Sequence, residues 1–386
     1  MSEAVAFRSG VQPGVRRTVR RGGGTVVVSG AAVLSAFGRG VEPLLAGALG
    51  GLPAFRSVDR FDVGGRRVKT AAVLPGSPDL VSELIRVVGE ACDDAGLSAA
   101  QRADCPLFLA VHADPELTRS AEPEGHGVDA FAQSIADRGG LSGSARAYTS
   151  ACVAASTAVA DAAAMIARGQ ASRIVVAAGY LVEADQFALF DAGRALALDG
   201  RVRPFSVDRS GLLLGDAVCA VVLESASPDP LARISGWGRA GDAFHVCRPR
   251  PDGAGLARAI TAAIQRASIQ PDEIGYVNAH GSGSKQSDAA EAAALRLALG
   301  DSAIPTSSTK SVHGQALEAG ALLELIVTIF ALRAGRLPVN AGYLGPDDDC
   351  RLALILDRSA ASNAEYALSV NLAFGGANTA LLVGAP

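Results

Sequence analysis

The chain has 386 residues, 49% of them hydrophobic, and a formal net charge of −4. This length and apolar content suffice for two ordinary domains or one large duplicated domain, and they exclude a disordered chain. No extended Lys/Arg tract occurs outside the N-terminal region, which excludes the basic footprint of a nucleic-acid-binding protein and a polybasic membrane patch. We therefore expect its partners to be small molecules or proteins.

The chain begins with a basic stretch and an apolar one, which together have the outline of an export signal. The apolar part opens with the β-branched run Val26–Val28, bounded by Gly22–Gly24 and Gly30. Such a run favours a buried first strand over a signal helix. Residues 1–24 are accordingly predicted to be a basic, flexible tail.

Later segments repeat one another at an offset of about half the chain. Residues 81–112 predict a helix, a polar turn and a strand, and residues 256–284 predict the same order. A second pair consists of the helix after Cys152 and the helix at 318–333. Strands that alternate with helices in this duplicated way predict two stacked α/β halves related by a pseudo-twofold axis, at 25–224 and 231–386.

Two observations bear on location. The apolar segment 321–335 is interrupted by Glu324 and is shorter than the roughly 20 residues that span a bilayer, so it predicts a buried helix and no membrane association. Scattered cysteines without a Cys-x-x-Cys pair are typical of a reducing compartment, which predicts a cytoplasmic protein with no metal site. These cysteines are Cys92, Cys105, Cys152, Cys219, Cys247 and Cys350.

Cys152 is the first candidate for chemistry. The small residues that follow it predict a helix from Val153, which places the thiol at a helix N-terminus, where the dipole lowers a thiol pKa and favours the thiolate. The structural alternative is that small residues at a helix start serve close packing.

Three further segments have the composition of site loops. His280 ends a predicted strand, and Lys310, His313 and Gln315 precede a predicted helix. A strand-to-strand turn contains Gly375–Gly376, which can bring backbone N–H groups close to a ligand, as in an oxyanion hole. The structural alternatives are a core histidine, a helix-capping loop and a glycine hairpin.

Five motifs in this order resemble those of the β-ketoacyl-acyl carrier protein synthases, the ketosynthases of the thiolase superfamily. The resemblance covers the chain from about Thr25 to Val383. The motifs are Thr149-Ser150-Ala151-Cys152, RPFSVDRSG at 203–211, NAHGSGS at 278–284 followed by Asp288 and Glu291, STKS at 308–311, and FGGAN at 374–378.

The resemblance implies a thiolase-like fold, with its halves stacked as α-β-α-β-α layers, and a decarboxylative Claisen condensation. Cys152 would take an acyl group from an acyl carrier protein, and the enolate from a malonyl thioester would then attack it. The N–H groups of Cys152 and Phe374 would form the oxyanion hole, and Phe374 would also gate the acyl pocket. His280 would assist decarboxylation.

Other positions follow from the same resemblance. Lys310 and Glu291 would form a buried charge pair that organises the site, and Gly375, Gly376 and Asn378 would line the substrate pocket. Cys219 and Asp216 would be structural. His112, His126 and His245 match no catalytic position and are expected on the surface or in loops.

Gln315 departs from the family pattern, in which elongating members carry a second catalytic histidine at this position. His313 lies two positions earlier, and this spacing turns its side chain away. We therefore do not expect His313 to take the role of the second catalytic histidine. Gln315 can donate a hydrogen bond to an enolate oxygen, as an asparagine does in chain-initiating members. A Cys-His-Gln set is therefore chemically possible.

The departure leaves alternatives to the condensing enzyme. A chain-length-factor-like, non-catalytic partner of a second ketosynthase would explain the lost histidine, although such partners usually lose the cysteine too. An acyltransferase or cyclase that does not decarboxylate would also use Cys152. A thiolase is less favoured, because FGGAN lacks the second cysteine. The superfamily implies a homodimer or a heterodimer with a paralogue, and no organic cofactor or metal.

Overall fold

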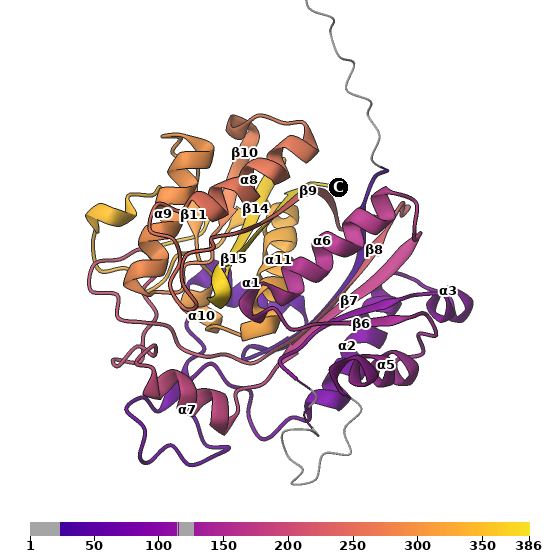
Figure 1. The fold of residues 1–386 in the computed structure, drawn as a ribbon, viewed down its shortest axis with the longest axis horizontal. Helices are drawn as coiled ribbons and strands as arrows, with labels where there is room; N and C mark the ends of the chain where they lie inside the picture. Colours follow the sequence, from indigo (N-terminus) through magenta and orange to yellow (C-terminus); the bar gives the residue numbers. More distant parts are fainter. Residues whose placement is uncertain (1–23, 114, 116–126) are drawn as a thin grey trace, which may run out of the picture.

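The computed structural model describes residues 24–113, 115 and 127–386; residues 1–23 of the expected tail, and His126, lie outside this part of the chain. Within it, the two halves contain the same succession of strands and helices (Figure 1). The first half contributes β1 (Val27–Ser35), β5 (Leu107–Ala110), β6 (Ala145–Tyr148), β7 (Arg173–Tyr180) and β8 (Ala217–Glu224). The second contributes β9 (Ala232–Gly241), β10 (Ile274–Asn278), β11 (Thr306–Ser307), β14 (Tyr366–Leu372) and β15 (Ala377–Gly384).

Strand order and direction are also duplicated. The first half runs β6-β5-β7-β8-β1 and the second β11-β10-β14-β15-β9. In each half the first three strands of that order are parallel to one another. The fourth strand is antiparallel to the third, and the fifth is antiparallel to the fourth. A short antiparallel ladder, Val27 with Arg233 and Val28 with Ala232, joins the halves. The strands β7 and β8 are buried almost throughout, as expected of sheets covered on both faces.

Helices fill the layers between and outside the sheets. The central layer is α6 (Ala154–Ala167) and α11 (Leu317–Ala334), each of which packs against strands of both halves (Figure 1). The outer helices of the first half are α2 (Leu80–Asp94), α3 (Ala99–Ala103) and α5 (Gly127–Arg138). Those of the second half are α8 (Ala254–Ala267) and α9 (Lys285–Leu299). This gives α-β-α-β-α layers, as predicted.

Shorter elements connect these layers. They are α1 (Val41–Gly50), α7 (Ala184–Ala192), α10 (Lys310–His313), β2 (Gly38–Arg39), β3 (Arg56–Ser57), β4 (Thr70–Ala71), β12 (Arg336–Leu337) and β13 (Ala360–Ala361). Four 3₁₀ turns are η1 (Ala151–Val153), η2 (Pro271–Glu273), η3 (Asp348–Cys350) and η4 (Phe374–Gly376). No helix among the described residues is long and apolar enough to cross a membrane.

The predicted join at 225–230 falls between β8 and β9, and the exact bounds of the halves stay a prediction. The apolar segment containing Glu324 is indeed a buried helix, α11. Such a helix, hydrophobic all round, belongs inside a protein. The helix after Cys152 begins at Ala154, one residue later than predicted, because η1 precedes it.

Candidate active site

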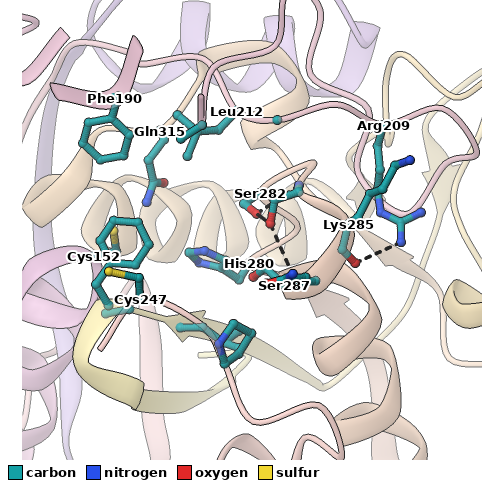
Figure 2. A pocket seen from close by; sticks show the side chains of 18 of the residues that line it. Cys152, Phe190, Arg209, Leu212, Cys247, His280, Ser282, Lys285, Ser287 and Gln315 are labelled. Carbon is teal, nitrogen blue, oxygen red and sulfur yellow. Dashed lines mark hydrogen bonds between the residues drawn. The ribbon is translucent and has the colours of Figure 1, made fainter. Parts of the chain in front are cut away.

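One cavity of about 360 Å³ brings together residues from distant segments. Cys152 enters it from the start of the central helix α6, and Gln315 from the loop before the other central helix, α11. His280 and Phe374 complete the lining from the loops after β10 and β14. Figure 2 shows His280 and Gln315 facing the side of the cavity where Cys152 lies.

Backbone strain marks the residue before Cys152. Ala151 has φ 49°, in the left-handed region that costs a residue with a Cβ about 1–2 kcal/mol. Such conformations cluster at functional sites, where surrounding structure enforces them. Cys152 follows within the η1 turn, and the first N–H groups of a helical turn have no partner inside it.

The Cys152 thiol does not have the lowered pKa that its helix position predicts. Burial raises the pKa of Cys152 to about 12, and the negative charge of Glu318 adds to this increase. Lys310 and a hydrogen bond from Gln315 act in the opposite direction. The resting side chain is therefore a thiol, because desolvation outweighs the effect of the helix start.

His280 is held as a neutral imidazole. Burial, together with the positive charge of Lys310, keeps the pKa of His280 well below its ordinary 6.5. The Glu291 side chain fixes the loop by accepting the backbone N–H of His280 (2.6 Å) and of Gly281 (2.7 Å). The Nδ1 of His280 is buried without a partner in the described part of the chain, and the residue itself lines the cavity.

Two backbone hydrogen bonds hold Gln315 in place, and the residue lines the cavity. Its N–H donates to Leu213 O (2.7 Å), and its carbonyl accepts the N–H of Gly215 (3.0 Å). The side-chain nitrogen lies on the side of Cys152 (Figure 2), and Oε1 has no partner among the described residues. An amide N–H held in this way can donate to an oxygen that develops negative charge.

His313 does not line this cavity. Its ring lies within hydrogen-bond distance of Gly314 O (Nδ1, 2.8 Å) and Thr309 Oγ1 (Nε2, 2.9 Å), so both nitrogens are engaged elsewhere. Burial lowers the pKa of His313 to about 3, which keeps the ring neutral. These contacts agree with the expectation that it does not replace the missing second histidine.

The buried charge pair has a different acidic partner from the one expected. Lys310 forms its ion pair with Glu324 of α11, and not with Glu291. The other oxygen of Glu324 accepts a hydrogen bond from Asn371 Nδ2 (2.6 Å). Glu291 instead holds the His280 loop, and burial raises its pKa to about 8. Sequence reasoning missed Glu324, although a lone carboxylate within an apolar helix was the visible sign.

Both glycine N–H groups of the turn are occupied by hydrogen bonds within the protein. Gly375 N–H donates to Val246 O (2.7 Å) and Gly376 N–H to Ala373 O (3.2 Å), so neither glycine faces a ligand through its N–H. Phe374 opens the η4 turn, where an N–H has no partner within the turn. The N–H groups of Cys152 and Phe374 therefore remain the candidates for an oxyanion hole.

Phe374 and Asn378 have different positions relative to the cavity. The Phe374 ring is 51% exposed and stacks on Phe190 of α7, with centroids 6.2 Å apart. Asn378 is buried and binds Asp242 (2.8 Å), and it does not line the cavity. Asn378 thus supports the turn, in contrast to the expected place in the substrate pocket.

Two of the three remaining histidines lie in the described part of the chain. His245 is exposed and accepts the backbone N–H of Cys247, as expected of a loop residue. His112 is also an exposed loop residue, as expected, and its Nδ1 lies 3.1 Å from Oε1 of the buried Glu318. Asp216 is structural as predicted, because it pairs with Arg60 (2.7 Å).

Comparison with known proteins agrees with this geometry. Residues 80–229 match the family described as beta-ketoacyl synthase, N-terminal domain, and residues 231–343 match its C-terminal domain. A Streptomyces cyaneus protein assigned as a polyketide beta-ketoacyl synthase is 31% identical over 288 residues, 71% of this chain and 67% of that protein. The chain spans between 50% and 67% of the length of this and other curated relatives.

Solved structures share the fold. The ishigamide ketosynthase/chain length factor has a TM-score of 0.86 at 26% identity, covering 94% of this chain and 100% of that one. AntDE:AntF, a type II polyketide synthase acyl-carrier protein in complex with its ketosynthase, has a TM-score of 0.84 at 22% identity, with the same coverage. The predicted thiolase-like fold is thus confirmed, and the matches to both domains show that the chain belongs to the beta-ketoacyl synthase family.

Proposed function

We propose that this protein is a condensing enzyme that extends an acyl chain carried on Cys152. The observation that carries the proposal is the single cavity lined by Cys152, His280, Gln315 and Phe374. It combines a nucleophile, a neutral imidazole, an amide donor and two backbone N–H groups, which are the elements of acyl transfer.

In the first step, the Cys152 sulfur attacks the carbonyl carbon of an acyl thioester. The bond from that carbon to the donor sulfur breaks, and the Cys152 proton ends on the departing thiol. The N–H groups of Cys152 and Phe374 stabilise the oxyanion of the tetrahedral intermediate. Because the resting side chain is a thiol, this step needs transient proton acceptance, a role that we assign to the neutral imidazole of His280, which lines the same cavity.

In the second step, a malonyl thioester loses carbon dioxide and becomes an enolate. The enolate carbon attacks the acyl carbon on Cys152, the carbon–sulfur bond breaks, and the thiolate is then protonated. Neutral His280 and the Gln315 amide donate hydrogen bonds to the thioester oxygen as it gains charge. Neither role requires a proton to be transferred permanently, so Gln315 can act where relatives carry histidine.

The donor of both thioesters, on this proposal, is an acyl carrier protein. One similar structure is a ketosynthase in complex with such a carrier, and this supports the assignment. Arg194 and Lys285 are exposed and line the cavity, so they suit the anionic phosphate of a carrier's pantetheine arm.

We also propose that the protein works as a dimer with itself or a paralogue, as its resemblance to a ketosynthase/chain length factor suggests. The six free cysteines suit a reducing compartment, which supports a cytoplasmic location.

The test is intact-protein mass spectrometry of the purified chain after incubation with acyl-carrier protein and then malonyl-carrier protein. We expect an acyl adduct on Cys152, absent in Cys152→Ala, followed by release of a β-ketoacyl product. Gln315→Ala should lower condensation by about 10²-fold, since that is the usual cost of one oxyanion donor. Gln315→His should preserve condensation or raise it.

Other outcomes would contradict the proposal in distinct ways. Acylation without release of carbon dioxide would indicate a transferase or cyclase. No acylation of the chain alone, with activity only beside a paralogous ketosynthase, would indicate the non-catalytic partner.

A further inference from the structure

A second group of polar side chains lies next to the nucleophile, outside the cavity described above. Glu318 in the first turn of α11 pairs with His112, which follows β5. His112, Tyr180 and Gln186 line a small cavity of about 30 Å³. We refer to these four residues as the His112 cluster.

Three buried polar atoms of this cluster have no hydrogen-bond partner in the described part of the chain. They are Glu318 Oε2, Tyr180 Oη and Gln186 Oε1. Their residues are only 3%, 4% and 8% exposed. Each unsatisfied buried polar group costs about 1–3 kcal/mol. Two of the three, on Tyr180 and Gln186, belong to residues that line the same cavity, so a ligand hydrogen-bonded there would recover part of this cost.

The cluster borders the catalytic cavity through two elements. Glu318 lies three positions after Gln315, and Gln186 lies four positions before Phe190 on α7; both Gln315 and Phe190 line the catalytic cavity. Gln186 and Phe190 are both on α7, where residues four positions apart lie on one face. Gln315 precedes α11, so Glu318 is close to it along the chain. The Glu318 carboxylate is also close enough to contribute, after burial, to the raised pKa of Cys152.

The unpaired atoms specify the chemistry of an occupant. The hydrogen bond to Glu318 raises the pKa of His112, and it engages Oε1 of Glu318, so Oε2 stays without a partner among the described residues. Glu318 Oε2 can only accept a hydrogen bond, whereas the Tyr180 hydroxyl can donate one. Glu318 is close enough to Tyr180 for its negative charge to contribute, after burial, to the raised pKa of the tyrosine. We expect a hydroxyl group to satisfy both partners at once, a ketone only Tyr180, and a methylene neither. The small cavity has room for about one such group.

We propose that the His112 cluster binds a hydroxyl group of the acyl chain attached to Cys152, so that the enzyme selects hydroxyacyl over unsubstituted acyl groups. This inference rests on the proposed function, in which Cys152 carries the chain. It adds a substrate class that the catalytic residues themselves do not specify.

The test compares rates of Cys152 acylation by pantetheine thioesters of hexanoate, 3-hydroxyhexanoate and 6-hydroxyhexanoate, measured by intact mass. At least one hydroxy thioester should react about tenfold faster than the hexanoyl thioester, as expected for a buried hydrogen bond to a charged group. Glu318→Leu should bring this rate ratio to about one, since it removes the acceptor. The ratio cancels any change in thiol pKa, because the same Cys152 reacts with each thioester.

Two tyrosine variants make the test independent of how Glu318→Leu folds. Tyr180→Phe removes only an unpartnered oxygen and should lower the ratio about threefold. Tyr276→Phe is the matched control, because Tyr276 is equally buried but bonds to Ser307 (2.8 Å) and lines neither cavity; its ratio should stay at the wild-type value.

Equal rates for all three thioesters, or a preference that survives both Glu318→Leu and Tyr180→Phe, would overturn the hydroxyl site and leave the proposed function standing. Failure of every thioester to acylate Cys152 would instead contradict the proposed function, and this inference with it.

Discussion

Lys310 lies in a part of the molecule that excludes water, and its charge is tolerated because Glu324 is equally buried and directly paired with it. Removing one member of such a pair leaves an uncompensated buried charge, which is far more costly than removing both. The amide N–H of Asn371 donates to the second carboxylate oxygen, so both oxygens of Glu324 have partners.

At the residue scale, we predict that Glu324→Leu destabilises the protein by about 3–5 kcal/mol, whereas Lys310→Met combined with Glu324→Leu recovers most of this loss. Thermal and urea unfolding of the two variants and the wild type would measure the difference. If the double variant were as unstable as Glu324→Leu alone, the charge of Lys310 would not be the cause.

At the element scale, each sheet approaches its outer helix closely at glycine positions. A Cβ on Gly238 of β9 would lie 1.8 Å from Ala259 O of α8, and one on Gly30 of β1 would lie 2.3 Å from Ala91 O of α2. These contacts are equivalent in the two halves, because β1 packs against α2 in the same way that β9 packs against α8. Helix and strand can therefore pack at this distance only without a side chain between them.

We predict that Gly238→Ala lowers the free energy of unfolding by about 1–3 kcal/mol, since the helix backbone must move to admit the methyl group. Gly241→Ala on the same strand is the matched control, because its Cβ would meet no atom within 4 Å, and it should change stability by less than about 0.5 kcal/mol. Equal unfolding midpoints for the two variants would show that the close approach of β9 to α8 does not determine the stability of the Gly238 variant.

At the scale of the whole molecule, the two halves share their core. The central helices α6 and α11 each pack against strands of both halves, and most residues of α11 are buried. Separating the halves would expose these apolar faces to water, at a cost of roughly 25 cal/mol per Å² of apolar surface.

We therefore predict that residues 24–230 and 231–386, expressed separately, do not fold cooperatively. Calorimetry of each fragment should show no sharp unfolding transition, in contrast to the full chain. A fragment that melted sharply, near the melting temperature of the full chain, would contradict a shared core and indicate an autonomous domain.

The sequence by itself determined the elements, their duplication and the loops that carry chemistry. Hydrophobic periodicity is a local property, so the helices of 81–97 and 256–269 could be recognised as equivalents without knowledge of their packing. The same holds for Cys152 and Gln315, which lie two residues before Ala154 and Leu317, the first residues of the equivalent helices α6 and α11.

Only the tertiary structure decided which side chains meet. Lys310 pairs with Glu324 and not Glu291, the glycine N–H groups are occupied, and His112 pairs with Glu318 across 206 positions of sequence. The thiol pKa likewise rises, because desolvation depends on what surrounds the helix start and not on the helix itself. Burial and pairing of charges depend on which distant segments come into contact in the folded chain, and the local pattern of a sequence does not determine those contacts.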